Sequence, residues 1–306
     1  MSVRLDKTAA LEQPLAAAAR TPASVVRDYV SLLKLRIVAL LDVTAVAVML
    51  PAAHGHPRPA AVVAVVIGLT CAAGGAHAIN MWFDRDIDAK MTRTRGRPLP
   101  AGRIPPWHAV ALGIGLNVVA FAVLWAGANL LAAVLDLIGA LIYVFVYTLW
   151  LKRSTPQNIV IGGAAGAVPP LVGWAAATGN LDATAIALFG VIFFWTPPHF
   201  WALAQMIKSD YARADIPMLP VVAGEQSAKR QSIVYAVLTA AVSVVPFFTG
   251  SAGDIYLAGA VVLGIGLVGI TVLDLHGKRW TRRLFAYSIV YVALLFTLFA
   301  VSPFLP

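Results

Sequence analysis

The sequence HAVALGIGLNVVAFAVLWAG occupies residues 108–127, and NLLAAVLDLIGALIYVFVYTLW follows almost at once at residues 129–150. Between them, the two runs contain one charged side chain, that of Asp136. A helix needs about 20 mostly apolar residues to cross the hydrocarbon core of a bilayer, and each run meets that length. This region therefore predicts two membrane-spanning helices joined by a very short turn.

The rest of the 306-residue chain has the same character. Hydrophobic residues make up 60% of it and charged residues 12%, about half the ~25% share of charged residues in a soluble domain. This composition excludes a soluble enzyme, a disordered chain and a disulfide scaffold, and the one cysteine, Cys71, excludes a cysteine metal site. We expect an all-α membrane protein with nine transmembrane helices, near residues 37–53, 59–82, 108–127, 129–150, 159–178, 184–206, 232–250, 255–274 and 284–303.

The connections between these helices differ in charge on the two sides of the membrane. Of the 23 lysines and arginines, all but Arg58 precede the first span or lie in alternate connections. Basic connections stay in the cytoplasm, which predicts a cytoplasmic N-terminus and a C-terminus outside. The net charge of +9 is then mostly a topological signal and does not indicate nucleic acid as a partner. We expect residues 1–30 to form a cytoplasmic tail and residues 31–306 to form a single nine-helix domain.

The end of the second span carries the most informative polar residues. Asn80, Asp84 and Asp88 follow one another at four-residue spacing, so they share one face of a continuing helix. Such oxygen ligands suit Mg²⁺, whose coordination is usually completed by substrate phosphates and water. Arginines match phosphate oxygens bidentately, and three of them follow: Arg93, Arg95 and Arg97. An acidic helix end solvated by water is the alternative, although carboxylates are unfavourable at a helix C-terminus.

A second polar connection repeats this theme. Lys208, Asp210 and Tyr211 follow the sixth span, with Asp215 five residues beyond Asp210. Within that span, His199 comes directly after two consecutive prolines. Proline frees backbone carbonyls, which is tolerated where a helix lines a cavity or where neighbours satisfy them. His199 is therefore a candidate for substrate contact or for packing. The intramembrane acids Asp42 and Asp136 are further candidates, because burying such groups is costly.

These motifs resemble the UbiA superfamily of intramembrane prenyltransferases. Asn80, Asp84 and Asp88 match the superfamily's first aspartate-rich motif. The resemblance narrows to the protohaem IX farnesyltransferase group over three blocks: residues 80–103 (NMWFDRDIDAKMTRTRGRPLPAGR), 147–174 (YTLWLKRSTPQNIVIGGAAGAVPPLVGW) and 195–222 (WTPPHFWALAQMIKSDYARADIPMLPVV). It implies nine helices around a central cavity, farnesyl diphosphate and protohaem IX as substrates, Mg²⁺ as cofactor, and haem O as product on the way to haem A.

The resemblance also assigns roles to residues. It implies that Asn80, Asp84, Asp88 and Asp210 hold the metal and that Lys152 and Arg153, the basic pair before Thr-Pro, join them in catalysis. The implied substrate-binding residues are Arg93, Arg95, Arg97, Lys208, Tyr211, Tyr147 and His199. The chain departs from the group at Leu35, where proline is usual, and in the second acidic motif, because Asp215 stands five residues from Asp210.

Two other functions remain open from the sequence. A prenyltransferase acting on an aromatic quinone precursor such as 4-hydroxybenzoate would share the acidic motifs. A secondary transporter could use Asp42, Asp136 or the acidic mouth, although nine spans fit inverted repeats poorly. Under the farnesyltransferase interpretation, the protein lies in a bacterial inner membrane with its active site facing the cytoplasm, and a haem A synthase is a possible partner.

Overall fold

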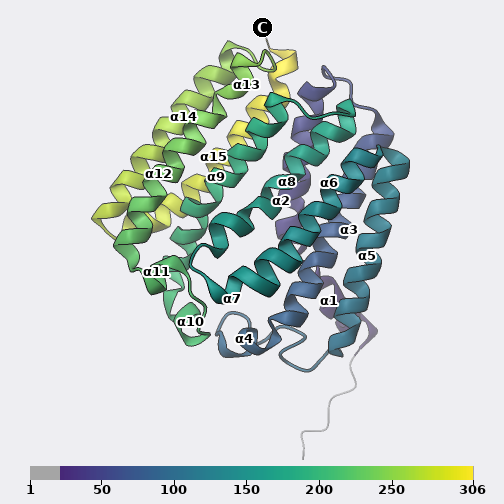
Figure 1. The fold of residues 1–306 in the computed structure, drawn as a ribbon, viewed down its shortest axis with the longest axis vertical. Helices are drawn as coiled ribbons and strands as arrows, with labels where there is room; N and C mark the ends of the chain where they lie inside the picture. The colour runs from purple at the N-terminus through teal and green to yellow at the C-terminus, as the bar shows by residue number, and fades with distance from the viewer. Residues whose placement is uncertain (1–20, 306) are drawn as a thin grey trace, which may run out of the picture.

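The computed structural model describes residues 21–305, and every regular element among them is a helix. Nine helical segments in this range are long and apolar enough to cross a membrane (Figure 1): Leu35–Ala52, Pro59–Phe83, Pro106–Gly127, Leu130–Ser154, Asn158–Thr178, Ala183–Met206, Glu225–Phe248, Asp254–His276 and Lys278–Phe304. The prediction of an all-α protein with nine membrane-spanning helices is confirmed over this part of the chain.

Several of these segments are built from more than one element. In chain order the elements are α1 (Pro22–Leu32), α2 (Leu35–Ala52), α3 (Pro59–Phe83), α4 (Arg85–Lys90), α5 (Pro106–Gly127), α6 (Leu130–Leu141), the π-helix η1 (Ile142–Leu151), α7 (Lys152–Ser154), α8 (Asn158–Thr178), α9 (Ala183–Met206), α10 (Lys208–Arg213), α11 (Leu219–Val222), α12 (Glu225–Ser243), α13 (Val245–Phe248), α14 (Asp254–Leu273), η2 (Asp274–His276), α15 (Lys278–Val301) and η3 (Ser302–Phe304).

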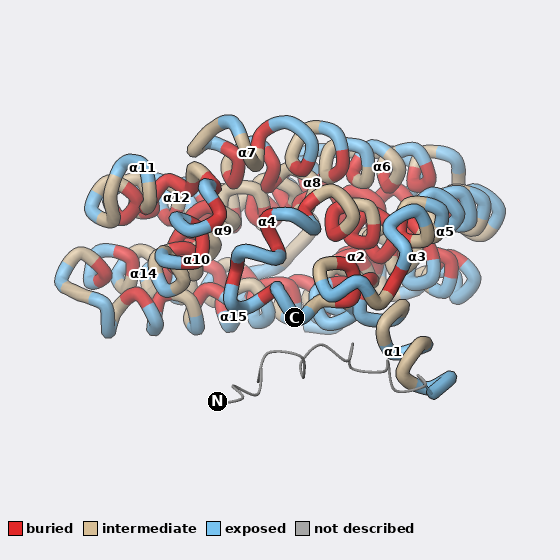
Figure 2. The backbone as a smooth tube through the Cα atoms, turned by 90° about the horizontal axis from the view of Figure 1, so that it is seen from below, coloured by how far each residue is buried: buried red, intermediate tan, exposed pale blue. Residues whose placement is uncertain are grey.

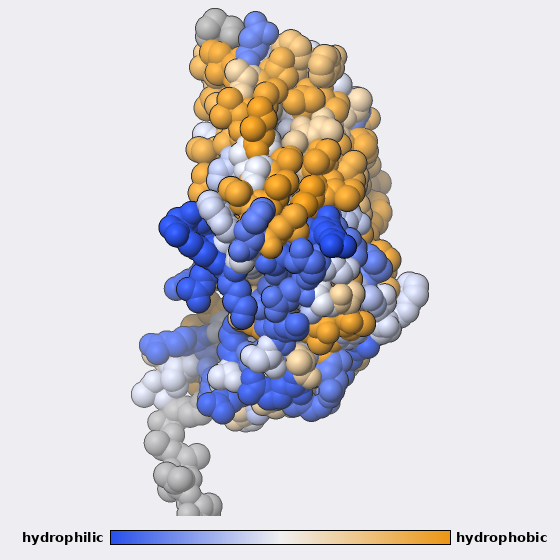
Figure 3. All heavy atoms as spheres, turned by 90° about the vertical axis from the view of Figure 1, so that its left-hand side faces the viewer, coloured by the Kyte–Doolittle hydropathy of each residue, from blue (hydrophilic) through white to orange (hydrophobic). Residues whose placement is uncertain are grey.

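Four of the short helices gather at one end of the bundle, which we call the polar end and which carries residues 84–105 and 207–224. α4, α7, α10 and α11 lie there, while the C-terminus lies at the opposite end (Figure 1). Seen from below, α4 and α10 lie near the middle of this end (Figure 2), and Lys90 Nζ stands 3.4 Å from Asp215 Oδ2 between the two segments. The side surface is hydrophilic near this end and apolar beyond it (Figure 3). That division is typical of a bundle embedded in lipid.

Small residues let the membrane helices approach closely. A Cβ on Gly75 of α3 would lie 2.7 Å from Gly113 O of α5, and the reverse contact is equally short. A Cβ on Gly173 of α8 would overlap the carbonyl oxygen of Ala45 in α2. Helix association in lipid depends on such close packing, because apolar burial supplies no driving force there. These glycines therefore set the spacing of α3 against α5 and of α2 against α8.

Two helices begin earlier than the apolar pattern predicts. α12 begins at Glu225 and α15 at Lys278, where the sequence predicted starts near residues 232 and 284. The added turns contain polar residues that pair inside the bundle. Lys229 is 5% exposed and donates to the backbone oxygen of Asp274 at 2.6 Å, and Thr281 Oγ1 donates to Asp274 Oδ1 at 2.5 Å. Because these polar groups pair with one another, the helices extend beyond their apolar runs.

Part of the predicted tail is also helical. Residues 22–32 form α1, which begins after Thr21, whose Oγ1 accepts from the Ser24 N–H at 3.3 Å. Arg103 Nε lies 3.0 Å from Asp28 Oδ2, so an ion pair ties α1 to the connection before α5. The remainder of the predicted tail, residues 1–20, lies outside the described residues.

Candidate active site

Asn80, Asp84 and Asp88 lie where α3 gives way to α4. The Asp84 N–H donates to Asn80 O at 2.9 Å and the Asp88 N–H donates to Asp84 O at 2.8 Å, so helical bonding continues through the junction. The four-residue spacing thus keeps the three side chains on one face, as the sequence predicted. All three are buried, with exposures of 3%, 1% and 3%, and Asn80 Nδ2 donates to Asp84 Oδ2 at 2.7 Å. Two carboxylates buried this deeply need positive partners.

The predicted basic pair supplies those partners for Asp84. Lys152 Nζ forms an ion pair with Asp84 Oδ2, and Arg153 Nη2 stands 3.5 Å from Asp84 Oδ1. Arg153 also binds both oxygens of Asp86 at 2.7 and 2.8 Å. The hydrogen bond from Arg153 is the main cause that lowers the pKa of the half-exposed Asp86 carboxyl, and it outweighs the opposing effect of partial burial. The structure therefore brings together two segments that are 68 residues apart in sequence.

A π-helix positions Lys152, and the sequence analysis missed it. η1 replaces the last turns of the fourth span, and Thr148 Oγ1 donates to Tyr143 O, five residues earlier, at 2.8 Å. Thr148 Oγ1 in turn accepts from Asn80 Nδ2 at 3.1 Å. Tyr147, on the same segment, packs so closely on α8 that a Cβ on Gly162 would overlap its ring. A π-helix in a run of ordinary apolar residues leaves no trace in hydrophobic periodicity, and such segments often mark functional sites.

The three predicted arginines take different positions. Arg97 Nη1 lies 2.7 Å from Asp88 Oδ2, and Thr94 Oγ1 holds the Asp88 backbone oxygen at 2.9 Å. Arg93 meets the second acidic segment through its backbone, because its N–H donates to Asp210 Oδ2 at 3.4 Å. Arg95 is exposed at the surface of the polar end. Of the three side chains, that of Arg97 is the one placed directly on the acidic motif.

The second polar connection meets the first through Asp210 and Tyr211. Burial opposes ionisation of Asp210, but the Arg93 and Thr92 backbone amides and the Arg213 charge lower its pKa overall. Tyr211 is 4% exposed and packs with Ile87 and Met91; burial first, and Tyr147 second, raise its pKa to about 12. Two residues of this connection pair outside the acidic site. Lys208 Nζ pairs with Glu225 at 3.5 Å, and Asp215 is an exposed partner of Lys90.

Lys34 joins this site, and the sequence analysis counted it only as a topological charge. It lies between α1 and α2 with φ 50° and ψ 46°, a left-handed conformation that is rare for a residue with a side chain. Its Nζ donates to Asn80 Oδ1 at 3.2 Å. Burial, followed by the charges of Arg97 and Lys152, lowers its pKa to about 7. Its position directly before the first span was the available signal, but no local pattern predicts the direction of its side chain.

The charges around the α3–α4 junction carry a positive excess. Asp84, Asp86 and Asp88 face four partly buried cations: Lys34, Arg97, Lys152 and Arg153. An anion would compensate this partly buried surplus of positive charge. Ammonium and guanidinium groups are the usual partners of phosphate oxygens, and the carboxylates could hold a metal ion beside them. The arrangement is suited to binding a polyanion such as a diphosphate.

Comparison with known proteins identifies the family. A family model described as the UbiA prenyltransferase family matches residues 41–289. This range contains every acidic and basic residue of the candidate site except Lys34. The chain belongs to the UbiA prenyltransferase family.

Three relatives of this UbiA-family chain have the same name. Proteins from Symbiobacterium thermophilum and Gloeobacter violaceus, both called protoheme IX farnesyltransferase, are each 51% identical to it. The first match covers 89% of this chain and 92% of the relative, and the second covers 88% and 89%. A relative of the same name from a Roseiflexus species is 49% identical and longer, so that the chain spans 53% of its length.

Solved structures share the fold of this UbiA-family chain. A digeranylgeranylglyceryl phosphate synthase superimposes with a TM-score of 0.77 at 18% identity, covering 91% of this chain and 98% of that one. A UbiA homolog from Archaeoglobus fulgidus, bound to GPP and Mg²⁺, gives a TM-score of 0.62 at 18% identity, covering 90% of this chain and 100% of that one. At these identities the comparison establishes a common architecture.

The oxygen donors of this UbiA-family site fit a magnesium ion. Asp84 and Asp88 are buried carboxylates that already attract cations, and the Asn80 amide lies against Asp84. Among residues 21–305, no three His, Cys, Asp or Glu side chains gather closely enough to enclose a metal ion. Mg²⁺ commonly takes one or two carboxylates and completes its shell with phosphate oxygens and water, so an open donor set of this kind suits it.

His199 lies between two other helical side chains in this UbiA-family bundle. Its ring stacks on Trp195 and Phe285, with centroids 4.3 and 4.8 Å away. Its Nδ1 lies 2.7 Å from Ser288 Oγ. These contacts explain the residue as a packing element between α9 and α15, and contact with haem stays a prediction. Of the two intramembrane acids, Asp42 accepts from Thr70 Oγ1 at 2.9 Å and Asp136 is buried.

Proposed function

We propose that this chain transfers the farnesyl group of farnesyl diphosphate to a vinyl group of protohaem IX, which yields haem O for haem A synthesis. The observation that carries the proposal is the excess of lysine and arginine charge around the buried Asn80, Asp84 and Asp88, a setting suited to diphosphate. The names and 51% identity of the two relatives support protohaem as the acceptor.

Charge explains the first step of the reaction. The bond between farnesyl C1 and oxygen breaks, its electron pair leaves with the diphosphate, and an allylic cation remains. Lys152, Arg153 and Arg97 stabilise the negative charge that develops on the leaving group, and Lys34 adds to this from α2. Mg²⁺, held by Asn80, Asp84, Asp88 and Asp210, would supply further charge neutralisation.

The second step needs an apolar environment. The terminal carbon of the haem vinyl group attacks farnesyl C1, which moves the positive charge to the carbon beside the pyrrole ring. A water molecule then adds to that carbon and releases a proton, leaving a hydroxyl group on the product. The allylic cation must not meet water before the vinyl group does. A central cavity among nine apolar helices, with its mouth at the polar end, would protect it. Tyr211 belongs to a buried cluster at this end, and Tyr147 packs against that cluster.

We also propose that the polar end faces the cytoplasm of a bacterial inner membrane. This orientation agrees with the basic asymmetry of the sequence, because all lysines and arginines except Arg58 belong to that side. Single cysteines in place of Arg95 and Ala223, in a Cys71→Ala background, should react with an impermeant thiol reagent only from the cytoplasmic side. A cysteine at Asn180 should react only from outside. Labelling of positions 95 and 223 from opposite faces would contradict the proposed topology.

The decisive experiment follows the product. Purified protein in nanodiscs receives farnesyl diphosphate, Mg²⁺ and equal amounts of protohaem and 4-hydroxybenzoate, and extracted products are identified by mass spectrometry. We expect haem O alone, and an Asp84→Asn variant as control should form none. A farnesylated 4-hydroxybenzoate without haem O would overturn the haem assignment while retaining the prenyltransferase. No product with either acceptor would refute the proposed function.

Association with a haem A synthase, the consumer of haem O, is a separate proposal that co-purification tests.

A further inference from the structure

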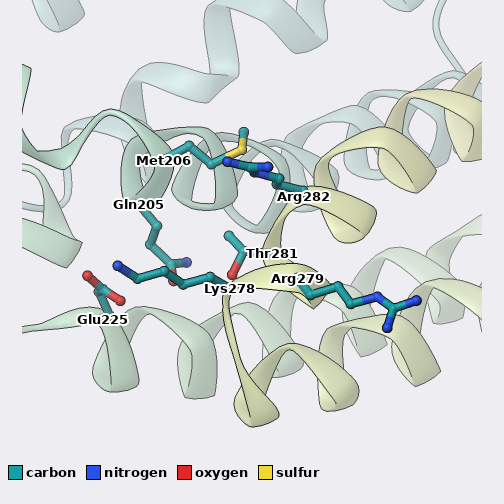
Figure 4. Close-up of a pocket in the computed structure, with 7 residues that line it drawn as sticks. All are labelled: Gln205, Met206, Glu225, Lys278, Arg279, Thr281 and Arg282. Atoms are coloured by element: carbon teal, nitrogen blue, oxygen red, sulfur yellow. The ribbon is translucent and has the colours of Figure 1, made fainter.

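A polar cavity lies near the acidic site, between the end of α9 and the beginnings of α12 and α15. Its volume is about 650 Å³, within the ~300–1,000 Å³ range of small-molecule sites. Three cations of α15 line it, together with Gln205 and Met206 (Figure 4): Lys278, Arg279 and Arg282. Met206 stands four residues before Asp210 in sequence, so the cavity adjoins the acidic site without sharing its residues.

The cavity has a net positive lining. Glu225 is its one carboxylate, and Lys208 Nζ lies 3.5 Å from that carboxylate, so Glu225 is already engaged from outside the lining. Figure 4 shows Lys278 extending toward Glu225, Arg282 extending toward Met206 and Arg279 extending away from both. The positive charge of this lining favours an anionic ligand, and the guanidinium of Arg282 can pair with a carboxylate or phosphate through two parallel bonds.

One wall of this cavity is held in place by buried contacts. Thr281, which lines the cavity, donates to Asp274 Oδ1, and Asp274 is 0% exposed. Lys229 of α12 donates to Asp274 O at 2.6 Å. The first turn of α15 is therefore tied to both α12 and η2. On the facing wall, Gln205 Nε2 donates to Trp201 O at 3.3 Å, while Gln205 Oε1 is buried without a hydrogen-bond partner. A ligand that donates a hydrogen bond, or a water molecule that accompanies it, would satisfy this oxygen.

Deeper between the same two helices lies an aromatic layer. His199 is seven residues before Met206 on α9, and Ser288 is seven residues after Thr281 on α15. Seven residues of α-helix span about 10 Å. The stacked rings of Trp195, His199 and Phe285 thus lie about two turns below the cations. The interface between α9 and α15 therefore has cations at the membrane boundary and packed aromatic rings beneath them.

We propose that this cavity binds the two propionate carboxylates of protohaem. The inference rests on the proposed function and specifies where the acceptor is held. Protohaem is a flat apolar ring with two carboxylates on one edge and two vinyl groups on the opposite edge. Carboxylates paired with Lys278 and Arg282 would direct the vinyl edge away from these cations. The headgroup phosphate of an acidic lipid offers similar anionic chemistry, so the experiment separates the two.

The test compares protohaem with its dimethyl ester, which has no anionic carboxylates. Binding to the purified protein is followed by the haem absorption band in detergent, without farnesyl diphosphate, so that turnover is not required. We expect the wild type to bind the diacid at least tenfold more tightly than the ester, because two charge-assisted contacts are lost in the ester. The Lys278→Gln/Arg282→Gln double variant should lose this preference. In turnover assays its KM for protohaem should rise at least tenfold, with kcat and the KM for farnesyl diphosphate unchanged.

Arg283→Gln is the matched control. It removes one charge from the same exposed helix end, where Arg283 packs over the Trp280 ring at 4.7 Å and does not line the cavity. It should retain the preference for the diacid. Equal wild-type affinity for diacid and ester would overturn the proposal even if the protein makes haem O. The proposal would also be overturned if the double variant keeps its preference for the diacid but loses a preference for phosphatidylglycerol over phosphatidylcholine in nanodisc binding. That result would assign the cavity to an acidic lipid. A wild type that prefers the diacid but forms no haem O would instead refute the proposed function.

Discussion

Replacing Asp84 by asparagine tests the acidic site most directly. Asp84 is 1% exposed and pairs with Lys152, whose side chain is 14% exposed. Removing one partner of a buried pair leaves the other charge uncompensated, which costs about 3–5 kcal/mol. Asp84→Asn should therefore lower the unfolding free energy by about that amount. It should also reduce kcat at least about hundredfold, because losing one preorganised electrostatic contact has an effect of that order.

A double variant separates the two effects. Asp84→Asn/Lys152→Gln removes both charges, so the stability lost in the single variant should largely return. Activity should not return, because a metal ligand and a diphosphate contact are both missing. Asp86→Asn is the control, because the Asp86 side chain is 58% exposed and its pairing contributes less than about 1 kcal/mol. Thermal unfolding and haem O formation are measured for all four proteins. Turnover close to wild type in Asp84→Asn would refute the assignment of the site.

Three further predictions concern helix packing and a buried ion pair. Gly162→Ala should lower Tm and reduce haem O formation, because its Cβ would overlap the Tyr147 ring and overpacking costs about 1–3 kcal/mol; Gly166→Ala, with open space around its Cα, should leave both unchanged. Lys229→Met should destabilise the protein by about 3–5 kcal/mol in thermal or denaturant unfolding, since it leaves Asp274 buried without its cation, and an unchanged Tm would contradict that role. His199→Ala should lower Tm, because its stacking contacts are lost, and should weaken haem binding. An unchanged haem spectrum and affinity would show that His199 acts in packing and does not contact haem.

The sequence by itself determined the elements of the fold. Membrane thickness requires runs of about 20 apolar residues, so the nine spans can be read from composition and length. Helical spacing likewise placed Asn80, Asp84 and Asp88 on one face, because residues four apart share a face wherever the helix continues. Polar turns at the starts of α12 and α15 were missed, since an apolar pattern does not detect Lys229 paired with Asp274.

Only the tertiary structure decided which charges meet. Lys152 reaches Asp84 across 68 positions of sequence, and it does so from the end of a π-helix that apolar periodicity does not reveal. Lys34, whose backbone is left-handed between two helices, donates to Asn80, while Lys208 pairs with Glu225 outside the acidic site. Local sequence determines where a helix can form and which face a residue occupies. The partner of a charged side chain depends on how distant helices pack, and that is set by contacts such as Gly162 against Tyr147.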